Sequence, residues 1–230
     1  MALYDPFAEQ YNEMVKAGGP ENSYQYIMEH LSGISELQGK KICDIGCGQG
    51  ELSYRLSLRG AVVTGVDLSI KLLEFAQQKT DKVTWVHDDA MKLSKLPNET
   101  FDYVVSSLML MDLPNHRDVF TASQRILKSE GIMIWVITHP CFQSPFSFPL
   151  GDGSRKIKQY DSQFWKSEGK GTIRSTVGAY HRPLSEYLND FIVSGFSIVQ
   201  LDEPKRMDNS VDLLPSLLAV VGQKSSNHLY

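Results

Sequence analysis

The stretch that decides the fold is KKICDIGCGQGELSYRLSLRGAVVTGVD, residues 40–67. It opens with a short apolar run, Lys41–Ile45, of the kind that forms a buried parallel strand. The run stops at three glycines, Gly46, Gly48 and Gly50, which allow unusual backbone angles and leave the main chain bare. Leucines at helical spacing follow, and a second apolar run ends in an aspartate. This order predicts a βαβ unit that binds its ligand at the carboxyl ends of its strands.

The spacing of the glycines bears on which ligand the loop takes. A dinucleotide-binding fingerprint has the form GxGxxG, with the third glycine opening the helix, but Glu51 occupies that position here. A short-chain dehydrogenase would also need a tyrosine followed four residues later by lysine, which Tyr160, Tyr180 and Tyr187 are not. The carboxylate of Asp67 suits ribose hydroxyls in either kind of nucleotide. The loop therefore disfavours NAD.

A series of four motifs carries a family resemblance. DIGCGQG, VTGVDLS, VHDDA and FDYVVSSLML follow one another in order, each at the end of an apolar run. Over residues 40–139 this series resembles the class I S-adenosylmethionine-dependent methyltransferases of the small-molecule type. The resemblance implies an α/β fold: a doubly wound, Rossmann-like, mostly parallel sheet of seven strands with the last strand antiparallel beside the fifth. It also implies S-adenosyl-L-methionine as cofactor and methyl transfer as the activity.

The same resemblance suggests how the cofactor is held. Asp44 and the glycine loop would hold its methionine end, Asp67 its ribose, and Asp89 with the backbone of Ala90 its adenine. An N-terminal helix would lie across the cofactor and bring Tyr11 to it. The expected cofactor-binding residues are Tyr11, Asp44, Gly46, Cys47, Gly48, Gly50, Asp67, Leu68, Asp89, Ala90, Ser106, Ser107 and Leu108.

Three of these assignments have structural alternatives. Tyr11 could belong only to the core of the N-terminal helices. Asp88 and Asp89 could simply lie in a solvated loop. Asp67 could cap the helix that begins near Ser69 instead of facing a ligand.

The chemistry of methyl transfer limits what the protein must add. A sulfonium methyl is already electrophilic, so the protein has to align acceptor, methyl and sulfur rather than build a nucleophile. A hydroxyl or ammonium acceptor also needs a base, and histidine titrates near neutral pH. His139, His181 and Tyr180 are the candidates, although either histidine could only stabilise its own turn. Asp112 could be catalytic, but before Leu113 it is more simply a turn residue.

Other acceptors and functions are weighed against the same motifs. RNA 5-methylcytosine enzymes resemble one another in a second cysteine after the fourth strand, which the sequence SSLML lacks, so Cys141 is a weak candidate nucleophile. Enzymes that methylate base amines or glutamine amides share an Asn/Asp-Pro-Pro-aromatic turn, which is also missing here. The phrase HRPLSEYLNDFIVSGF resembles small-molecule members. A cofactor-binding sensor without catalysis remains the alternative from another class.

The composition excludes several broad classes. The chain has 230 residues and a formal net charge of −4, so it gives no basic footprint for nucleic-acid binding. It shows no leader-like segment and no apolar run of about eighteen residues, which leads us to expect a cytoplasmic protein without membrane contact. Its three cysteines are expected to be reduced, and they lack zinc-ligand spacing, so no metal is expected. The oligomeric state is left open.

We expect one domain, residues 1–230, made of four segments. These are an N-terminal helical cover (1–35), a cofactor-binding core (36–141), a lid insertion (142–180) and a C-terminal helix with strands (181–230). The lid is rich in glycine and proline, yet its aromatic residues argue against disorder. Its cations outnumber its acids, which could serve an anionic substrate, although a solvated charged loop explains them as well.

The apolar pattern also sets element boundaries. Ser69 is expected to cap one helix, and Asn115 another that continues through Leu127 toward Gly131. The expected strands are 41–45, 61–66, 83–86, 101–106, 132–137, 196–201 and 217–221.

Overall fold

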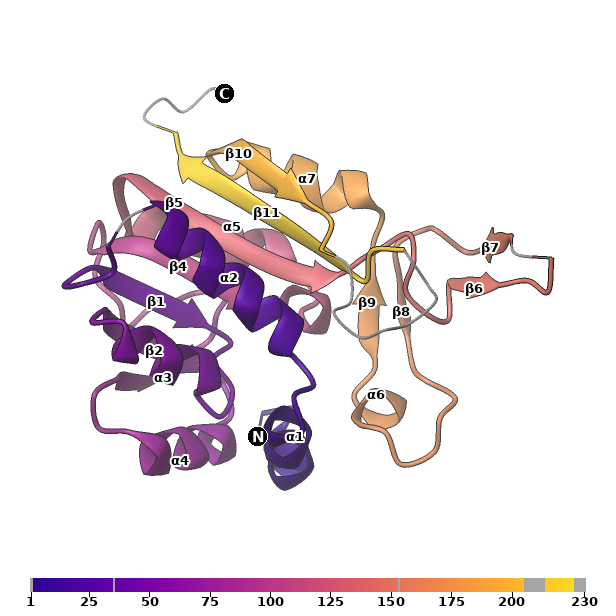
Figure 1. Cartoon of the computed structure of the whole chain (residues 1–230), viewed down its shortest axis with the longest axis horizontal. Coiled ribbons are helices and arrows are strands. Elements are labelled where there is room, and N and C mark those ends of the chain that lie inside the picture. The colour runs from indigo at the N-terminus through magenta and orange to yellow at the C-terminus, as the bar shows by residue number, and fades with distance from the viewer. Residues whose placement is uncertain (1, 35, 153, 205–213, 226–230) are drawn as a thin grey trace.

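A single twisted sheet of seven strands forms the centre of the molecule (Figure 1). The structure is a computed structural model that describes residues 2–34, 36–152, 154–204 and 214–225. The strands lie in the order β10-β11-β5-β4-β1-β2-β3, and β11 runs antiparallel to both of its neighbours. They are β1 (Lys41–Ile45), β2 (Val62–Asp67), β3 (Thr84–His87), β4 (Phe101–Ser107), β5 (Leu127–Thr138), β10 (Phe196–Asp202) and β11 (Leu217–Lys224). The predicted doubly wound, mostly parallel sheet is confirmed.

Helices cover both faces of this sheet. The helices of the described residues are η1 (Asp5–Phe7), α1 (Ala8–Lys16), α2 (Glu21–Ile34), α3 (Glu51–Leu58), α4 (Ile70–Lys79), η2 (Leu110–Asp112), α5 (His116–Ile126), α6 (Ile173–Thr176) and α7 (Leu184–Val193). One core cluster joins α2 and α3 to the sheet, and a second joins α5 and α7 to its other face. Within β5, Trp135 packs in the second cluster and Ile134 in the first, because alternate side chains of a strand point to opposite faces.

The boundary between α5 and β5 differs from the sequence prediction. The helix ends at Ile126, and Leu127 already pairs with Phe101 as the first residue of β5. The expectation that the helix includes Leu127 and ends near Gly131 is therefore wrong. The reason is a break in the strand register after Phe101, accompanied by a left-handed backbone at Glu130 (φ 59°), which periodicity does not reveal. Asn115 is the N-cap residue, but its side chain makes no capping hydrogen bond.

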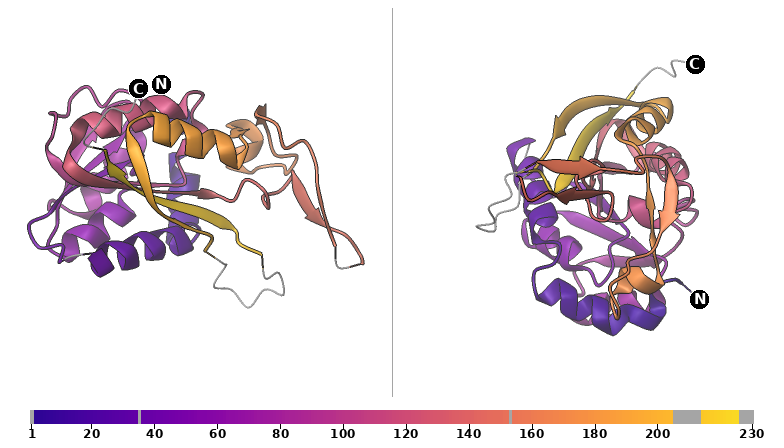
Figure 2. Two further views of the ribbon diagram at one scale, coloured as in Figure 1. Left: turned by 90° about the horizontal axis from the view of Figure 1, so that it is seen from above. Right: turned by 90° about the vertical axis from the view of Figure 1, so that its right-hand side faces the viewer.

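The lid insertion consists of two small hairpins and a short helix. β6 (Ser147–Pro149) pairs with β7 (Arg155–Ile157), and this hairpin projects away from the body (Figure 2). β8 (Gln163–Trp165) pairs with β9 (Ala179–His181), and α6 lies between these two strands in sequence. β9 contacts η2, so the second hairpin is held next to the loop that follows β4. Within the described ranges, no helix is long and apolar enough to cross a membrane.

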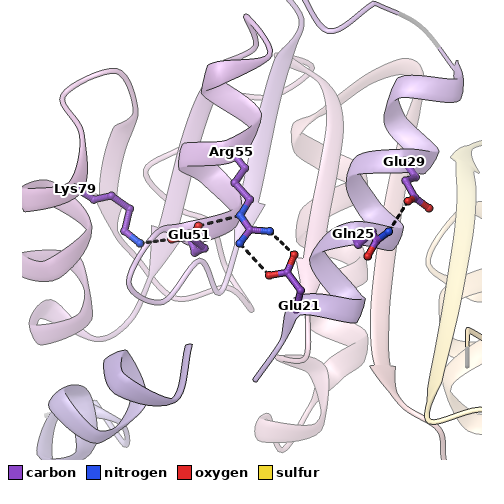
Figure 3. A network of polar contacts seen from close by, with 6 residues as sticks. All are labelled: Glu21, Gln25, Glu29, Glu51, Arg55 and Lys79. Atoms are coloured by element: carbon purple, nitrogen blue, oxygen red, sulfur yellow. Dashed lines mark hydrogen bonds and ion pairs between the residues drawn. The ribbon is translucent and has the colours of Figure 1, made fainter. Parts of the chain in front are cut away.

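A polar network ties α2 to α3, the helix that follows the glycine loop (Figure 3). Arg55 of α3 donates to both carboxylate oxygens of Glu21 in α2, at 2.7 and 2.9 Å, and its Nε donates to Glu51 at 2.9 Å. Lys79 of α4 pairs with the other oxygen of Glu51. A single exposed ion pair contributes little, but a fork-shaped arginine contact within a network fixes geometry. The network therefore fixes the positions of α2, α3 and α4 relative to one another, next to the glycine loop.

Candidate active site

A cavity of about 560 Å³ lies at the carboxyl ends of the parallel strands, within the usual range for small-molecule sites. Loops after β1, β2 and β3 contribute Gly46, Gly48, Asp67, Leu68, Asp89 and Ala90 to its wall. Ser107 ends β4 and Leu108 follows it, and Tyr11 comes from α1. Asp44, Cys47, Gly50 and Ser106, which were expected in the site, are outside the described wall and are buried behind it.

The glycine loop faces the cavity with bare backbone because neighbouring side chains leave no room for others. Gly46 has a φ of 70° and Gly48 a φ of 55°, both in the left-handed region. A Cβ on Gly48 would lie 3.0 Å from the ring of Tyr11, and one on Gly46 would lie 2.8 Å from Cβ of Met109. Tyr11 therefore packs against the glycine loop as well as against the helical core, and its role as a cover over a cofactor stays a prediction.

Asp67 joins the loops after β1 and β2 and still faces the cavity. One carboxylate oxygen accepts from the backbone N–H of Gly48 and the other from that of Ser69, each at 2.8 Å. Burial raises the pKa of Asp67, although these bonds favour its ionised form. The residue that caps α4 is Ser69, whose hydroxyl accepts from Leu72 N–H at 3.2 Å. Because a carboxylate has about four acceptor positions, Asp67 keeps capacity for two ligand hydroxyls.

The two adjacent aspartates after β3 have different environments. Asp88 is buried and accepts from the backbone N–H groups of Asp89 and Lys95, at 2.8 and 2.7 Å, and from the hydroxyl of Ser94. Asp89 lines the cavity, and one of its oxygens accepts from Met91 N–H at 2.9 Å. Asp88 therefore shapes the loop, and Asp89 is the residue of the pair that a ligand can reach.

A polar cluster that sequence reasoning did not assemble lies on the wall beyond the glycine loop. The hydroxyl of Tyr4 donates to Asp112 at 2.8 Å, and Arg174 of α6 forms an ion pair with the other oxygen of Asp112. Burial raises the pKa of Asp112, opposed by the charge of Arg174. These residues come from three distant segments: the N-terminus, η2 and the lid. Asp112 and the excess of cations in the lid were recognised from the sequence, but no sequence pattern indicated a role for Tyr4.

The expected bases lie outside the described cavity wall. His139 is buried, with Nδ1 accepting from Cys141 N–H at 3.1 Å and Nε2 2.7 Å from Glu203. His181 stacks on Phe146 and contacts the amide of Gln143 at 2.8 Å, and burial lowers its pKa. Tyr180 lies against Phe164 and under Arg182. Both histidines therefore have structural partners.

Known proteins resemble both the sequence and this arrangement. A family model described as a methyltransferase domain matches residues 43–135. An uncharacterized protein of Haemophilus influenzae is 30% identical over 192 residues, covering 77% of this chain and 75% of its own. A solved S-adenosylmethionine-dependent methyltransferase from Mesorhizobium loti superimposes with a TM-score of 0.70 at 27% identity, covering 82% of this chain and 93% of that one. The chain belongs to the class I S-adenosylmethionine-dependent methyltransferases.

Another relative is named a ubiquinone biosynthesis O-methyltransferase, from Histophilus somni. It is 29% identical over 183 residues, covering 70% of this chain and 75% of that protein. The cofactor of the present protein is S-adenosylmethionine, and the residues that line its cavity suit this cofactor. Acids at the ends of β2 and β3 can accept from hydroxyl and amino groups, and the bare glycine loop allows close approach.

Asp44 supports the glycine loop from behind the wall. Its carboxylate is buried and accepts from the hydroxyl of Ser53 at 2.6 Å, which links the end of β1 to α3. Burial raises the pKa of Asp44 to about 7, against the opposing effect of the Ser53 hydrogen bond. The charge state of this side chain therefore changes within the physiological range.

We expect this carboxyl to make the ligand-free methyltransferase less stable at pH 8 than at pH 5. The folded protein keeps a proton on Asp44 that the unfolded chain has already released, so the free energy of unfolding falls as pH rises from about 4 to about 7. One pKa unit corresponds to about 1.4 kcal/mol, which makes about 4 kcal/mol an upper bound. Urea denaturation across this pH range should show a flatter dependence for Asp44→Asn. The exposed control Asp81→Asn should leave the slope unchanged, and an equal slope in Asp44→Asn would contradict the assignment.

Proposed function

We propose that this methyltransferase transfers the methyl group of S-adenosylmethionine to a small-molecule acceptor. The observation that carries the proposal is the cover over the cavity. The N-terminal segment and the lid both line it, and the side-chain amide of Gln10 in α1 donates to the carbonyl of Gly171 at 2.9 Å. Figure 1 shows α1 and α6 together on this side of the sheet. A cavity closed from two sides suits a small acceptor better than a nucleic acid or a folded protein, and the O-methyltransferase relative supports the same class.

The cofactor would lie along the glycine loop. In this arrangement the carboxylate of Asp67 accepts from the ribose hydroxyls, and Asp89 accepts from the adenine amino group beside the backbone of Ala90. The loop at Gly46 and Gly48, covered by Tyr11, holds the methionine end. Asp44, Cys47, Gly50 and Ser106 support these groups from behind. Ser107 is fixed by the hydroxyl of Ser23 at 2.8 Å, and Leu68 and Leu108 supply apolar wall.

The acceptor would occupy the part of the cavity bounded by η2, the N-terminal segment and α6. When bound, the cofactor supplies the electrophilic methyl group, so the protein's task is to align the acceptor with it and exclude water. Apolar side chains on this part of the wall include Leu3, Met111 and Ile173. We propose that His139, His181 and Tyr180, which do not line the cavity, stabilise the lid. His181 acts through Gln143, whose carbonyl oxygen accepts from Thr138 on the wall.

The proposal is tested by following a labelled methyl group. The protein is incubated with methyl-tritiated S-adenosylmethionine and a desalted cell extract to which the low-molecular-weight fraction has been returned. We expect a labelled compound that separates chromatographically from S-adenosylmethionine to appear in the ultrafiltrate, and only when this fraction is present. Asp67→Ala serves as the control with weakened cofactor binding. Label recovered in retained RNA or protein would contradict a small-molecule acceptor. Firm calorimetric binding of S-adenosylhomocysteine without transfer to either fraction would favour the sensor.

A further inference from the structure

Arg174 enters the cavity with donors to spare. Its Nη1 contacts Asp112 and donates to the carbonyl of Gly178 at 2.9 Å, while Nε and Nη2 have no partner among the described residues. The side chain is 30% exposed, and the residue lines the cavity. Lys170 also lines the cavity and makes no hydrogen bond or ion pair within the described chain. The lid therefore brings two cations to the wall, and one of them presents unused guanidinium donors.

The guanidinium is held in place before any ligand arrives. Asp112 takes the Nη1 edge, and Asp112 is itself fixed by the hydroxyl of Tyr4. The chain after Asp112 is anchored by the buried Arg182, which donates to the carbonyls of Leu113 and Pro114 at 2.6 and 2.9 Å. These contacts already fix the Arg174 side chain in the ligand-free fold, so a ligand does not have to order it. Its Nε and Nη2 groups form a fork-shaped pair of donors, and a carboxylate matches this geometry.

The electrostatics at this end of the cavity favour an anion. Asp112 offsets the charge of Arg174, Lys170 adds one positive charge, and burial raises the pKa of Tyr4, so that hydroxyl stays neutral. The sulfonium of the bound cofactor adds a further positive charge at the reaction centre. An ammonium compound would be repelled by these groups, and a neutral one would form only hydrogen bonds to an uncharged acceptor, which are weaker than those to a carboxylate.

The carboxylate of the cofactor itself is the other anion that could reach a guanidinium. The contacts that lead from the glycine loop toward Arg174 pass through two aromatic rings. Tyr11 lies over Gly48, and Tyr4 stands edge-on to Tyr11 with 5.6 Å between ring centroids before it reaches Asp112. In the proposed arrangement the methionine end lies at the glycine loop, and the effect of Arg174→Gln on S-adenosylhomocysteine affinity distinguishes the two anions.

We propose that the acceptor is a small molecule with an apolar body and a carboxylate, and that Arg174 binds this carboxylate through Nε and Nη2. The inference rests on the proposed function and names the substrate class for the same site. Lys170 adds attraction at the wall of the cavity, and Met109, Met111, Leu113 and Ile173 surround the apolar body. Arg174 is thus the residue that determines specificity for the acceptor.

The test uses ligands that share an apolar body and differ in a negative, neutral or positive head group. Benzoate, phenylacetate and hexanoate are compared with their amides and with benzylamine, phenethylamine and hexylamine, by calorimetry on the protein saturated with S-adenosylhomocysteine. We expect at least one carboxylate to bind at least ten-fold more tightly than its amide and amine. Arg174→Gln should weaken that carboxylate about ten- to a hundred-fold, as the loss of charge-assisted hydrogen bonds predicts. Arg174→Lys, which keeps the charge but loses the fork, should fall between.

The controls separate this inference from the proposed function. Lys166→Gln removes a lid cation outside the described wall and should leave carboxylate affinity unchanged. Thermal melting of each variant shows that it is folded. If no carboxylate binds, or an amide or amine binds equally well, the carboxylate site is wrong. If Arg174→Gln weakens S-adenosylhomocysteine by the same factor, Arg174 holds the cofactor instead. Failure of the wild type to bind S-adenosylhomocysteine would contradict the proposed function itself.

Discussion

Replacing Asp67 with alanine should weaken the binding of S-adenosylhomocysteine about ten- to a hundred-fold and also destabilise the ligand-free fold. The affinity loss follows from removing a charged acceptor for the ribose hydroxyls, because hydrogen bonds to charged groups contribute about 1.5–3 kcal/mol. The stability loss follows from Gly48 and Ser69, whose N–H groups both lose their acceptor. An unsatisfied buried donor costs roughly 1–3 kcal/mol. Ser69, not Asp67, caps α4, so Asp67 supports the fold through these two N–H groups, and its role toward the cofactor is the proposal that the affinity measurement tests.

Calorimetry and thermal melting on the same preparation measure the two effects separately. Asp88→Asn is the matched control, since Asp88 also satisfies buried backbone N–H groups but lies outside the described wall. It should melt lower than the wild type and bind S-adenosylhomocysteine normally at a temperature where it is folded. Asp67→Asn keeps a neutral acceptor and should lie between alanine and wild type in both measurements. Undiminished affinity in Asp67→Ala would remove the residue from the cofactor site.

Replacing Gly50 with alanine should lower the melting temperature by about 5–15 °C and abolish firm cofactor binding. Gly50 has a φ of 82°, and a Cβ there would overlap the ring of Trp85 and lie 2.9 Å from Cβ of Ala76. Left-handed backbone costs a non-glycine residue roughly 1–2 kcal/mol, and overpacking about 1–3 kcal/mol more. For a chain of this size, each kcal/mol shifts the midpoint by about 2–4 °C. The backbone at Gly50 would have to move to relieve these contacts. Because the same backbone forms the loop that holds the cofactor, we expect binding to be lost.

Gly33→Ala is the control for this substitution. Gly33 lies in α2 and is not in the left-handed region, and a Cβ there would meet no atom of the described residues within 4 Å. Alanine is the better helix former, so this variant should be unchanged or up to about 1 kcal/mol more stable. Differential scanning calorimetry of both variants gives the comparison. Equal melting temperatures for Gly50→Ala and the wild type would show that the loop relaxes without cost and that the packing of Trp85 does not constrain it.

Much of the fold could be predicted because its signals are local. Apolar runs placed all seven strands of the main sheet, and Ser69 caps a helix where expected. The boundary between α5 and β5 was misplaced because the mixed apolar and charged residues around Leu127 fit the pattern of a helix as well as that of a strand. Pairing with Phe101 on β4 decides between them, and that contact is not local in sequence.

The cofactor half of the candidate site was also accessible from the sequence. Apart from Tyr11 on α1, its parts lie at the ends of strands or in the loops directly after them, and parallel strands deliver such residues to one edge of the sheet. The acceptor half was not accessible in this way. Its polar cluster unites Tyr4, Asp112 and Arg174, which are far apart in the chain. Conversely, His139 and His181 have the right chemistry for bases, but the fold turns them toward Glu203 and Gln143.

The sequence by itself determined the βαβ core, the glycine loop and the ends of the strands, because strand and helix periods and the backbone freedom of glycine act over a few neighbouring residues. Tertiary structure alone decided which side chains meet over the cavity. The lid is joined to the N-terminal segment through Gln10 and to η2 through Arg174, and no periodicity encodes either meeting. Such contacts depend on how distant segments pack, so the identity of the acceptor site is a property of the folded chain.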